Sequence, residues 1–297
     1  MSHALRAPDL ALISQSDSLF EAQLIKKLVA IFALCALILT PVCFSFAVES
    51  EHDPGQSTRW FRLGELMLSA TQTDGDYLLR FSKDEEELFA GACAFKTHEP
   101  TTIKNTPLAG CKTLLAYCFS GGAHCCTTLF IATECGPQAS LDMVDLGHTS
   151  GKILFAQTDD VPGKVMKVHD WQFAYYGPED CLIQLSFANS PAMTRLLVFD
   201  KGHWRVDRIG EFSRFYSRLI DKAVREAHFS AAKNEPELSA SLAMKAAYYG
   251  LMSGKSLDET AEVLNRLFPA QWKPQAGKVI QDIYRAAYEF SPVETIR

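Results

Sequence analysis

Residues 114–133 read LLAYCFSGGAHCCTTLFIAT, and the pair Gly121-Gly122 separates two apolar and β-branched runs within this stretch. Adjacent glycines between such runs are typical of a two-residue hairpin turn, because glycine adopts the positive φ angles that these turns require. With the two glycines as the turn, Cys118 faces Cys125 at a Cα distance of about 5 Å, which a disulfide spans. The stretch therefore predicts a β-hairpin closed by a Cys118–Cys125 disulfide.

Short runs of the same kind lie on both sides of this hairpin, separated by Gly, Pro, Asn and Asp. They predict strands at 77–82, 113–119, 125–133, 152–157, 182–187 and 195–200. Residues 198–206 also predict a hairpin, with its turn at Asp200–Gly202. Many short strands with frequent turns indicate an antiparallel β domain over 48–210, built either as a meander or as a degenerate propeller.

Beyond residue 210 the apolar side chains recur every three or four residues, which is typical of helices with one buried face. The recurring positions predict helices near 212–227, 238–249, 257–268 and 279–287. Ser256 and Glu259 have the spacing of a capping box, in which each side chain accepts a hydrogen bond from the other residue's backbone N–H. Because the connections are short, we expect about four antiparallel helices over 211–297. The predicted fold class is therefore α+β, with a β domain followed by a helical domain.

The N-terminal part of the chain has the order of a secretory signal. Residues 26–47 contain a basic pair, an apolar core and small side chains at 45 and 47. Residues 28–48 carry no charge and are long enough to cross a bilayer, so an uncleaved membrane anchor is the alternative. Residues 1–24 are polar and acidic, unlike the short basic n-region that precedes the apolar core of an ordinary signal peptide. We predict that 1–47 is a signal peptide or a membrane anchor with a polar N-terminal extension, and we expect a periplasmic or secreted protein, or one attached to a membrane through 28–48.

Charge and cysteine content narrow the class of partner and the compartment. The chain has 29 Lys and Arg against 35 Asp and Glu, a net charge of −6, so we expect no nucleic-acid partner. Of the nine cysteines, those beyond residue 47 are expected to pair in an oxidising compartment. The disulfide candidates are Cys93, Cys111, Cys118, Cys125, Cys126, Cys135 and Cys181.

The partner of Cys126 is left open by the sequence. On the predicted hairpin Cys126 points to the face opposite Cys125, because successive side chains of a strand alternate. It could then pair with one of four other cysteines, which are Cys135, Cys111, Cys93 and Cys181. A vicinal Cys125–Cys126 bond is the rival interpretation, and its strain would make it easier to reduce.

Three segments carry a resemblance. FSGGAHCC at 119–126, HDWQFAYY at 169–176 and FANSP at 187–191 together resemble a group of uncharacterised exported bacterial proteins. Members of that group share an SGGAHCC segment and a later D-W-x-F-A-Y segment, and their β regions resemble degenerate integrin-type (FG-GAP-like) propeller repeats. The resemblance covers roughly 113–208, and it implies a propeller-like fold and export but no activity.

These segments lack features that a metal site or a catalytic cysteine would need. Integrin-type repeats bind calcium through alternating carboxylates, whereas Asp159 and Asp160 are adjacent and their side chains diverge. His124 with Cys118, Cys125 and Cys126 would suit a soft metal, and His124 beside Cys125 a thiol nucleophile, but neighbours on a strand point to opposite faces. Nothing in the sequence selects another histidine as a base. We therefore expect structural cysteines, with no metal and no cofactor.

Aromatic residues after Asp170 offer a second candidate site. Trp171, Phe173, Tyr175 and Tyr176 could line a ligand-binding face, since aromatic rings beside a carboxylate suit sugars and peptides. The interpretation that we favour is that the rings fill the sheet core and Asp170 caps a turn. The candidate functional residues from both sites are Gly121, Gly122, His124, Cys125, Cys126, Asp170 and Trp171.

No complete catalytic motif is present in the chain, so we expect a protein that is not an enzyme. We predict an exported envelope protein that acts as a binding or interaction module for a protein or glycan ligand of the cell envelope. One alternative is a thiol-dependent enzyme or redox protein that uses Cys125 and Cys126, which would require a reachable thiol of lowered pKa. Another is an inhibitor that inserts the 120–123 loop into the cleft of an envelope hydrolase.

Overall fold

The computed structural model describes residues 58–73, 76–94, 100–121, 126–149, 153–177 and 183–296. All of them belong to one unit, which runs from Pro54 to Arg297. The predicted signal or anchor segment, 1–47, lies outside the described residues. Among the helices that are described, none is long and apolar enough to cross a membrane.

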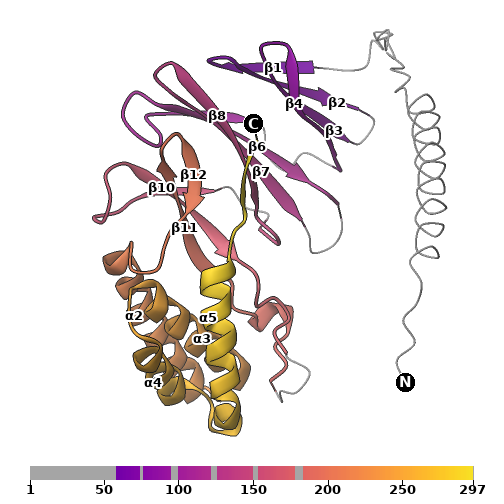
Figure 1. Cartoon of the computed structure of the whole chain (residues 1–297). Helices are drawn as coiled ribbons and strands as arrows, with labels where there is room; N and C mark the ends of the chain where they lie inside the picture. Colours follow the sequence, from indigo (N-terminus) through magenta and orange to yellow (C-terminus); the bar gives the residue numbers. More distant parts are fainter. Residues whose placement is uncertain are drawn as a thin grey trace, which may run out of the picture. The chain divides into compact units, whose positions relative to one another are not determined.

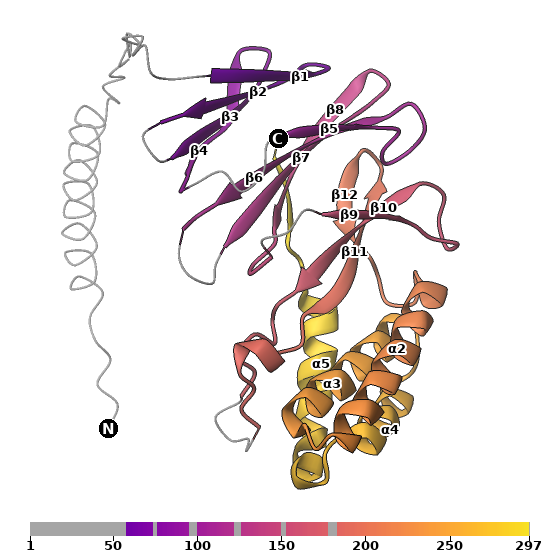
Figure 2. The same ribbon diagram turned by 180° about the vertical axis from the view of Figure 1, so that it is seen from behind.

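Three antiparallel sheets follow one another along the chain. Their strands are β1 Thr58–Leu63, β2 Leu66–Gln72, β3 Tyr77–Lys83, β4 Glu86–Cys93, β5 Thr101–Lys104, β6 Lys112–Phe119, β7 Thr127–Cys135, β8 Gln138–Asp145, β9 Leu154–Gln157, β10 Lys164–Asp170, β11 Met193–Asp200, β12 His203–Val206 and β13 Val293–Ile296. The sheet orders are β1-β2-β3-β4, then β5-β6-β7-β8 with β13 beside β8, then β9-β10-β11-β12. Consecutive strands are neighbours in each sheet, so each is an antiparallel meander, and β13 is added to the second sheet from the far end of the chain (Figures 1 and 2).

Four helices follow the third sheet, as predicted. They are α2 Ser213–Ala232, α3 Pro236–Met252, α4 Leu257–Leu267 and α5 Ala276–Glu289, and two short 3-10 helices lie at Phe187–Asn189 and Ala270–Gln275. The predicted capping box opens α4: Ser256 N–H donates to Glu259 Oε2 at 2.8 Å, and Glu259 N–H donates to Ser256 Oγ at 3.2 Å. The α+β fold class is confirmed. Within the described residues the meanders form no closed propeller.

Side chains that alternate along single strands fill successive cores between the layers. On β7, Phe130 enters the core shared with the first sheet, whereas Leu129 and Ile131 enter the core shared with the third. On β11, Leu197 faces that same core, and Leu196 packs with the helices. Because both faces of these strands are buried, they read as nearly continuous apolar runs.

Strand β13 ties the segment after α5 to the second sheet. It pairs with β8 in the register Val293↔Val144 to Ile296↔Leu141. Beneath this pairing, the buried carboxylate of Asp142 accepts hydrogen bonds from Thr295 Oγ1 and Trp204 N–H, both at 2.9 Å. One buried side chain therefore connects β8, β12 and β13.

The hairpin around the SGGAHCC segment is wider than predicted. Strands β6 and β7 pair with Phe119 opposite Thr127 and Cys118 opposite Thr128. Residues 120–126, and not two glycines alone, therefore connect the strands. Ser120 N–H donates to the Cys126 carbonyl oxygen at 3.0 Å, which closes the loop at its base.

The predicted Cys118–Cys125 disulfide is wrong, because Cys118 is bonded to Cys93. In the observed register Cys118 faces Thr128, and the disulfide instead connects β6 to the edge strand β4. A second disulfide joins Cys111 to Cys135. Cys126 is also disulfide-bonded, whereas Cys125 and Cys181 lie outside the described residues.

Two other local predictions have opposite outcomes. The hairpin over 198–206 is confirmed, with Asp200 opposite His203 and Lys201-Gly202 as its turn. The strand expected at 182–187 is wrong: within its described part, 183–186 has no regular structure and Phe187 begins a 3-10 helix. Ile183 and Leu185 are buried against the helices without pairing in a sheet. Their alternating apolar side chains therefore give the sequence pattern of a strand where none forms.

Candidate functional site

A pocket of about 360 Å³ opens beside the base of the SGGAHCC loop. Three segments supply most of its wall, namely the turn after β8, the end of β10 and the residues after α5. The lining residues are Cys126, Asp145, Gly147, His148, His169, Asp170, Trp171, Gln172, Phe290, Ser291 and Pro292. The structure thus brings three of the predicted site residues together, which are Cys126, Asp170 and Trp171.

Asp170 ends β10 and caps the turn that follows it. Its side chain is fully buried, and its Oδ1 accepts a hydrogen bond from Gln172 N–H at 2.9 Å. Its Oδ2 accepts a hydrogen bond from the Tyr248 hydroxyl at 3.0 Å. Burial raises the pKa of Asp170 above its ordinary value, against the lowering effect of these hydrogen bonds and of Arg195. The favoured interpretation of Asp170 as a turn cap is confirmed.

Trp171 is held in place from three directions. Its Nε1–H donates to Thr149 Oγ1 at 3.0 Å, and its ring stacks on Phe187 with centroids 5.6 Å apart and planes within 11°. Gly147 has a φ of +53°, and a Cβ at this position would lie 3.3 Å from Trp171 Cδ1. Glycine therefore suits both the backbone of this turn and the close approach of the indole.

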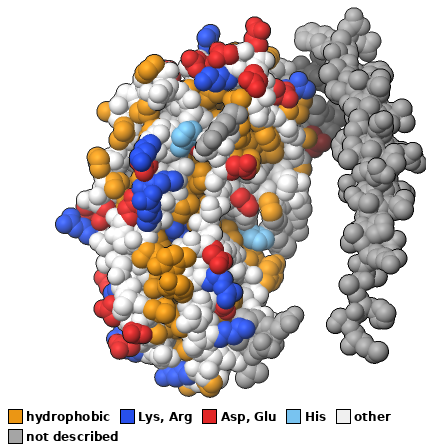
Figure 3. All heavy atoms as spheres, viewed as in Figure 1, with side chains coloured by type: hydrophobic (Ala, Val, Ile, Leu, Met, Phe, Trp, Pro, Cys, Tyr) orange, Lys and Arg blue, Asp and Glu red, His pale blue; other side chains and the backbone are white. Residues whose placement is uncertain are grey.

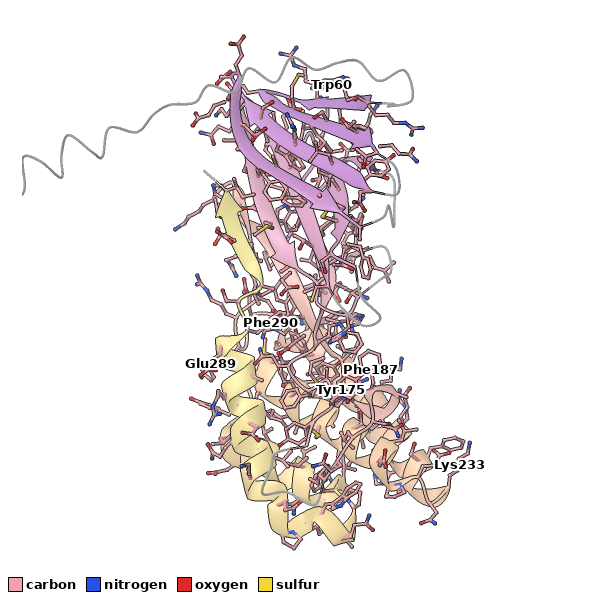
Figure 4. All side chains as sticks on the ribbon, turned by 90° about the vertical axis from the view of Figure 1, so that its right-hand side faces the viewer. Trp60, Tyr175, Phe187, Lys233, Glu289 and Phe290 are labelled. Carbon is pink, nitrogen blue, oxygen red and sulfur yellow. A yellow bond between two sulfur atoms is a disulfide. The ribbon has the colours of Figure 1, made fainter. Side chains whose placement is uncertain are left out.

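The aromatic residues after Trp171 separate into a buried and an exposed group. Phe173 and Tyr176 lie in the core, as expected, but Tyr175 is 53% exposed. Tyr175 has a φ of +55°, which is uncommon outside glycine, and its N–H donates to Ser190 Oγ at 2.8 Å. This backbone turns the ring outward, where it lies beside Phe187 at a centroid distance of 5.3 Å (Figure 4).

Two histidines flank Trp171, with ring centroids 5.5 Å away for His148 and 6.2 Å away for His169. The Nδ1 atom of each is buried and has no hydrogen-bond partner within the described residues. Burial lowers the pKa of His169, and the charge of Lys245 lowers it further, so this imidazole is neutral at pH 7. Sequence reasoning did not select these histidines, because they lie on different elements, and the HDWQFAYY segment that includes His169 implied no role for its histidine.

The remaining predicted site residues do not add to the described site. Gly121 has a φ of +90° and lies against Ala94, where an added Cβ would come within 3.2 Å of the alanine side chain. Gly122, His124 and Cys125 lie outside the described residues. Within the part of the chain that is described, no group of three or more His, Cys, Asp or Glu side chains could hold a metal ion.

Exposed aromatic side chains also occur on the helices, and two of them can serve as controls for substitutions beside the pocket. In the space-filling view, hydrophobic side chains also gather over the helices (Figure 3). Tyr284 on α5 and Phe229 on α2 are exposed, and among the described residues neither ring contacts Trp171, Tyr175 or Phe187 beside the pocket. They provide matched controls for substitutions of Tyr175 and Phe187.

Replacing Asp170 with Asn tests the effect of burial on its ionisation. Because its pKa is raised in the folded protein, folding favours the protonated form, so the stability that protonation provides is present at low pH and lost as the pH rises through the folded pKa. We expect the wild type to lose stability relative to Asp170→Asn as the pH is raised from about 4. Urea unfolding of both proteins across this range measures the difference, and a difference that does not change with pH contradicts the expectation.

Comparisons of the chain with protein-family models, curated proteins and solved structures give no match. A functional assignment therefore depends on the chemistry of the site. The pocket offers packed aromatic rings and a neutral imidazole, whereas the Asp170 carboxylate is fully buried in its wall and its cysteine is disulfide-bonded. This set of groups is suited to holding a ligand.

Proposed function

We propose that the protein is a non-enzymatic binding module that acts in the periplasm or after secretion and takes a protein or glycan ligand of the cell envelope. The observation that carries the proposal is the array of Trp171, Phe187 and Tyr175 beside the pocket. Within this array Phe187 lies between the other two rings, and Tyr175 is exposed to solvent.

Aromatic side chains are favourable binding groups because they provide a large apolar area together with a polar edge. Binding usually costs free energy for ordering side chains, and this cost is reduced when the rings are already fixed. Here the hydrogen bond from Trp171 to Thr149 and the stacking on Phe187 fix the array in advance. Tyr175 is held outward by its backbone hydrogen bond to Ser190.

The polar groups of the pocket support a ligand that combines apolar and hydrogen-bonding surfaces. His148 and His169 both line it, and both carry a ring nitrogen without a partner among the described residues. A few polar groups within an aromatic wall are typical of sites that orient a ligand. A sugar ring or a peptide backbone has the matching chemistry.

The disulfides are consistent with a location outside the cytoplasm. The bonds Cys93–Cys118 and Cys111–Cys135 suit an oxidising compartment, as does the predicted export signal over 1–47. Thiol chemistry has less support, because all five cysteines in the described ranges are disulfide-bonded.

Binding to arrays of envelope glycans and of synthetic peptides tests the proposal. For any ligand found, we expect Tyr175→Ala and Phe187→Ala each to weaken binding about tenfold or more, as the loss of an aromatic anchor residue does. Tyr284→Ala and Phe229→Ala remove exposed rings of the same types outside the pocket and should leave the affinity unchanged. Equal affinities for the wild type and the Tyr175 and Phe187 variants would place the ligand elsewhere and reject this site.

A further inference from the structure

A single buried guanidinium is connected to two of the segments that form the pocket wall, to one directly and to the other through a tyrosine hydroxyl. Arg195 on β11 has a side-chain exposure of 2%. Its Nη1–H donates to the Tyr248 hydroxyl at 2.9 Å, and that hydroxyl in turn donates to Asp170 on the wall segment that carries Trp171. The guanidinium also lies over the ring of Phe290, 5.1 Å from its centroid, in the wall segment that follows α5.

The guanidinium is itself fixed by further hydrogen bonds. Its Nε–H donates to Asp207 Oδ1 and its Nη2–H to the Asp207 carbonyl oxygen, both at 2.8 Å. Its Nη1–H also donates to the Ala287 carbonyl oxygen on α5, at 3.2 Å. The Tyr216 hydroxyl on α2 donates to the second oxygen of the Asp207 carboxylate. Charge-assisted hydrogen bonds of this kind are short and directional, so they hold the group at one position.

We infer that Arg195 and Tyr248 are positioning residues of the binding site. Through them, helices α3 and α5 set the separation of the Asp170 and Phe290 wall segments and thus the shape that the pocket presents. This inference rests on the proposed function. A buried ion pair is a weak source of net stability, because apolar side chains of the same volume often replace it without loss. The placement of this cluster directly behind both wall segments gives it a second role, which is to orient them.

Two neighbouring tyrosines of α3 provide a matched test. Tyr248 is fully buried, and its hydroxyl connects Arg195 to Asp170. Tyr249 is 5% exposed, and its hydroxyl accepts a hydrogen bond from the backbone N–H of Thr194 at 3.1 Å. Tyr248→Phe and Tyr249→Phe each remove one buried hydroxyl and keep the ring, but only the first breaks the connection to the pocket wall.

Two measurements report on the structure of the pocket wall, and neither needs a ligand. The chain has four tryptophans, so 5-fluorotryptophan labelling of the whole protein gives one 19F signal for each, and Trp171→Phe identifies the signal of Trp171. In Tyr248→Phe we expect a shifted Trp171 signal and about tenfold faster hydrogen exchange at the Gln172 amide, which donates to Asp170. In Tyr249→Phe both readouts should match the wild type, while the Trp60 signal is unchanged in either variant.

Either of two results overturns the inference. If Tyr248→Phe leaves the Trp171 signal and Gln172 exchange unchanged, the hydroxyl does not position the wall. If both tyrosine variants change them equally, the effect is general loosening of the core. Because these measurements are made without ligand, they fail or succeed independently of the glycan and peptide arrays that test the proposed function.

Discussion

Replacement of Arg195 with Met is expected to lower the free energy of unfolding by about 3–5 kcal/mol. Asp207 is 3% exposed, and its carboxylate would lose its cationic partner while remaining buried. Burial already raises the pKa of Asp207, and Arg195 is the main influence that lowers it. The loss therefore comes chiefly from an uncompensated buried charge, and chemical denaturation measures it.

Arg205 supplies the control for this substitution. Like Arg195 it forms ion pairs, in this case with Asp200 at 2.9 Å and with Glu211 at 2.7 Å. Its side chain, however, is 27% exposed. Solvent and salt screen such pairs, so Arg205→Met should cost about 1 kcal/mol or less. The double variant Arg195→Met with Asp207→Asn should recover part of the lost stability, because it removes the buried charge. Equal costs for the two arginine variants would contradict this account.

Removal of the Cys111–Cys135 disulfide is expected to cost about 3.5 kcal/mol. The bond joins residues with a sequence separation of 24, and its absence gives the unfolded chain the conformational freedom that this loop now lacks. Cys111→Ala with Cys135→Ala keeps small apolar side chains at both positions. Urea unfolding of oxidised wild type and variant measures the difference.

The second disulfide, Cys93–Cys118, provides a comparison for this cost, and both pairings can be tested directly. Cys93–Cys118 has a separation of 25, so Cys93→Ala with Cys118→Ala should have a cost similar to that of the first pair. Mass spectrometry of non-reduced peptides should recover both pairs. Recovery of a Cys118–Cys125 peptide, or an unchanged stability in either double variant, would contradict the structure.

The helical part was predictable because each helix leaves a local trace in the sequence. The stripe over 212–227 recurs every three or four residues since α2 buries one face, and the Ser256–Glu259 box marks a helix start through contacts within four residues. The hairpin at 198–206 was equally local. In each case the interactions that define the element lie within the segment that was read.

The errors arose where distant contacts decide the structure. The pairing of Cys118 depends on the position of Cys93 in another sheet, and no spacing within the hairpin reveals it. Ile183 and Leu185 resemble a strand but are buried by helices instead. Strand β13 was missed because the sheet edge that it completes lies at β8, far back in the chain.

The candidate site was predictable only in part, for the same reason. The sequence singled out Asp170 and Trp171, which are adjacent, and it named Tyr175 without its outward direction. That direction depends on a positive φ and on Ser190, which no local pattern indicated. Tyr248 and Arg195 reach Asp170 across long stretches of chain, so their connection to the pocket is visible only in three dimensions.

The pairing of β13 with β8 has a consequence for the order of assembly. Because β13 follows α5, the second sheet receives this strand only after all four described helices have been synthesised. Until then the backbone groups along the outer edge of β8 have no neighbour and are open to strands of other nascent chains.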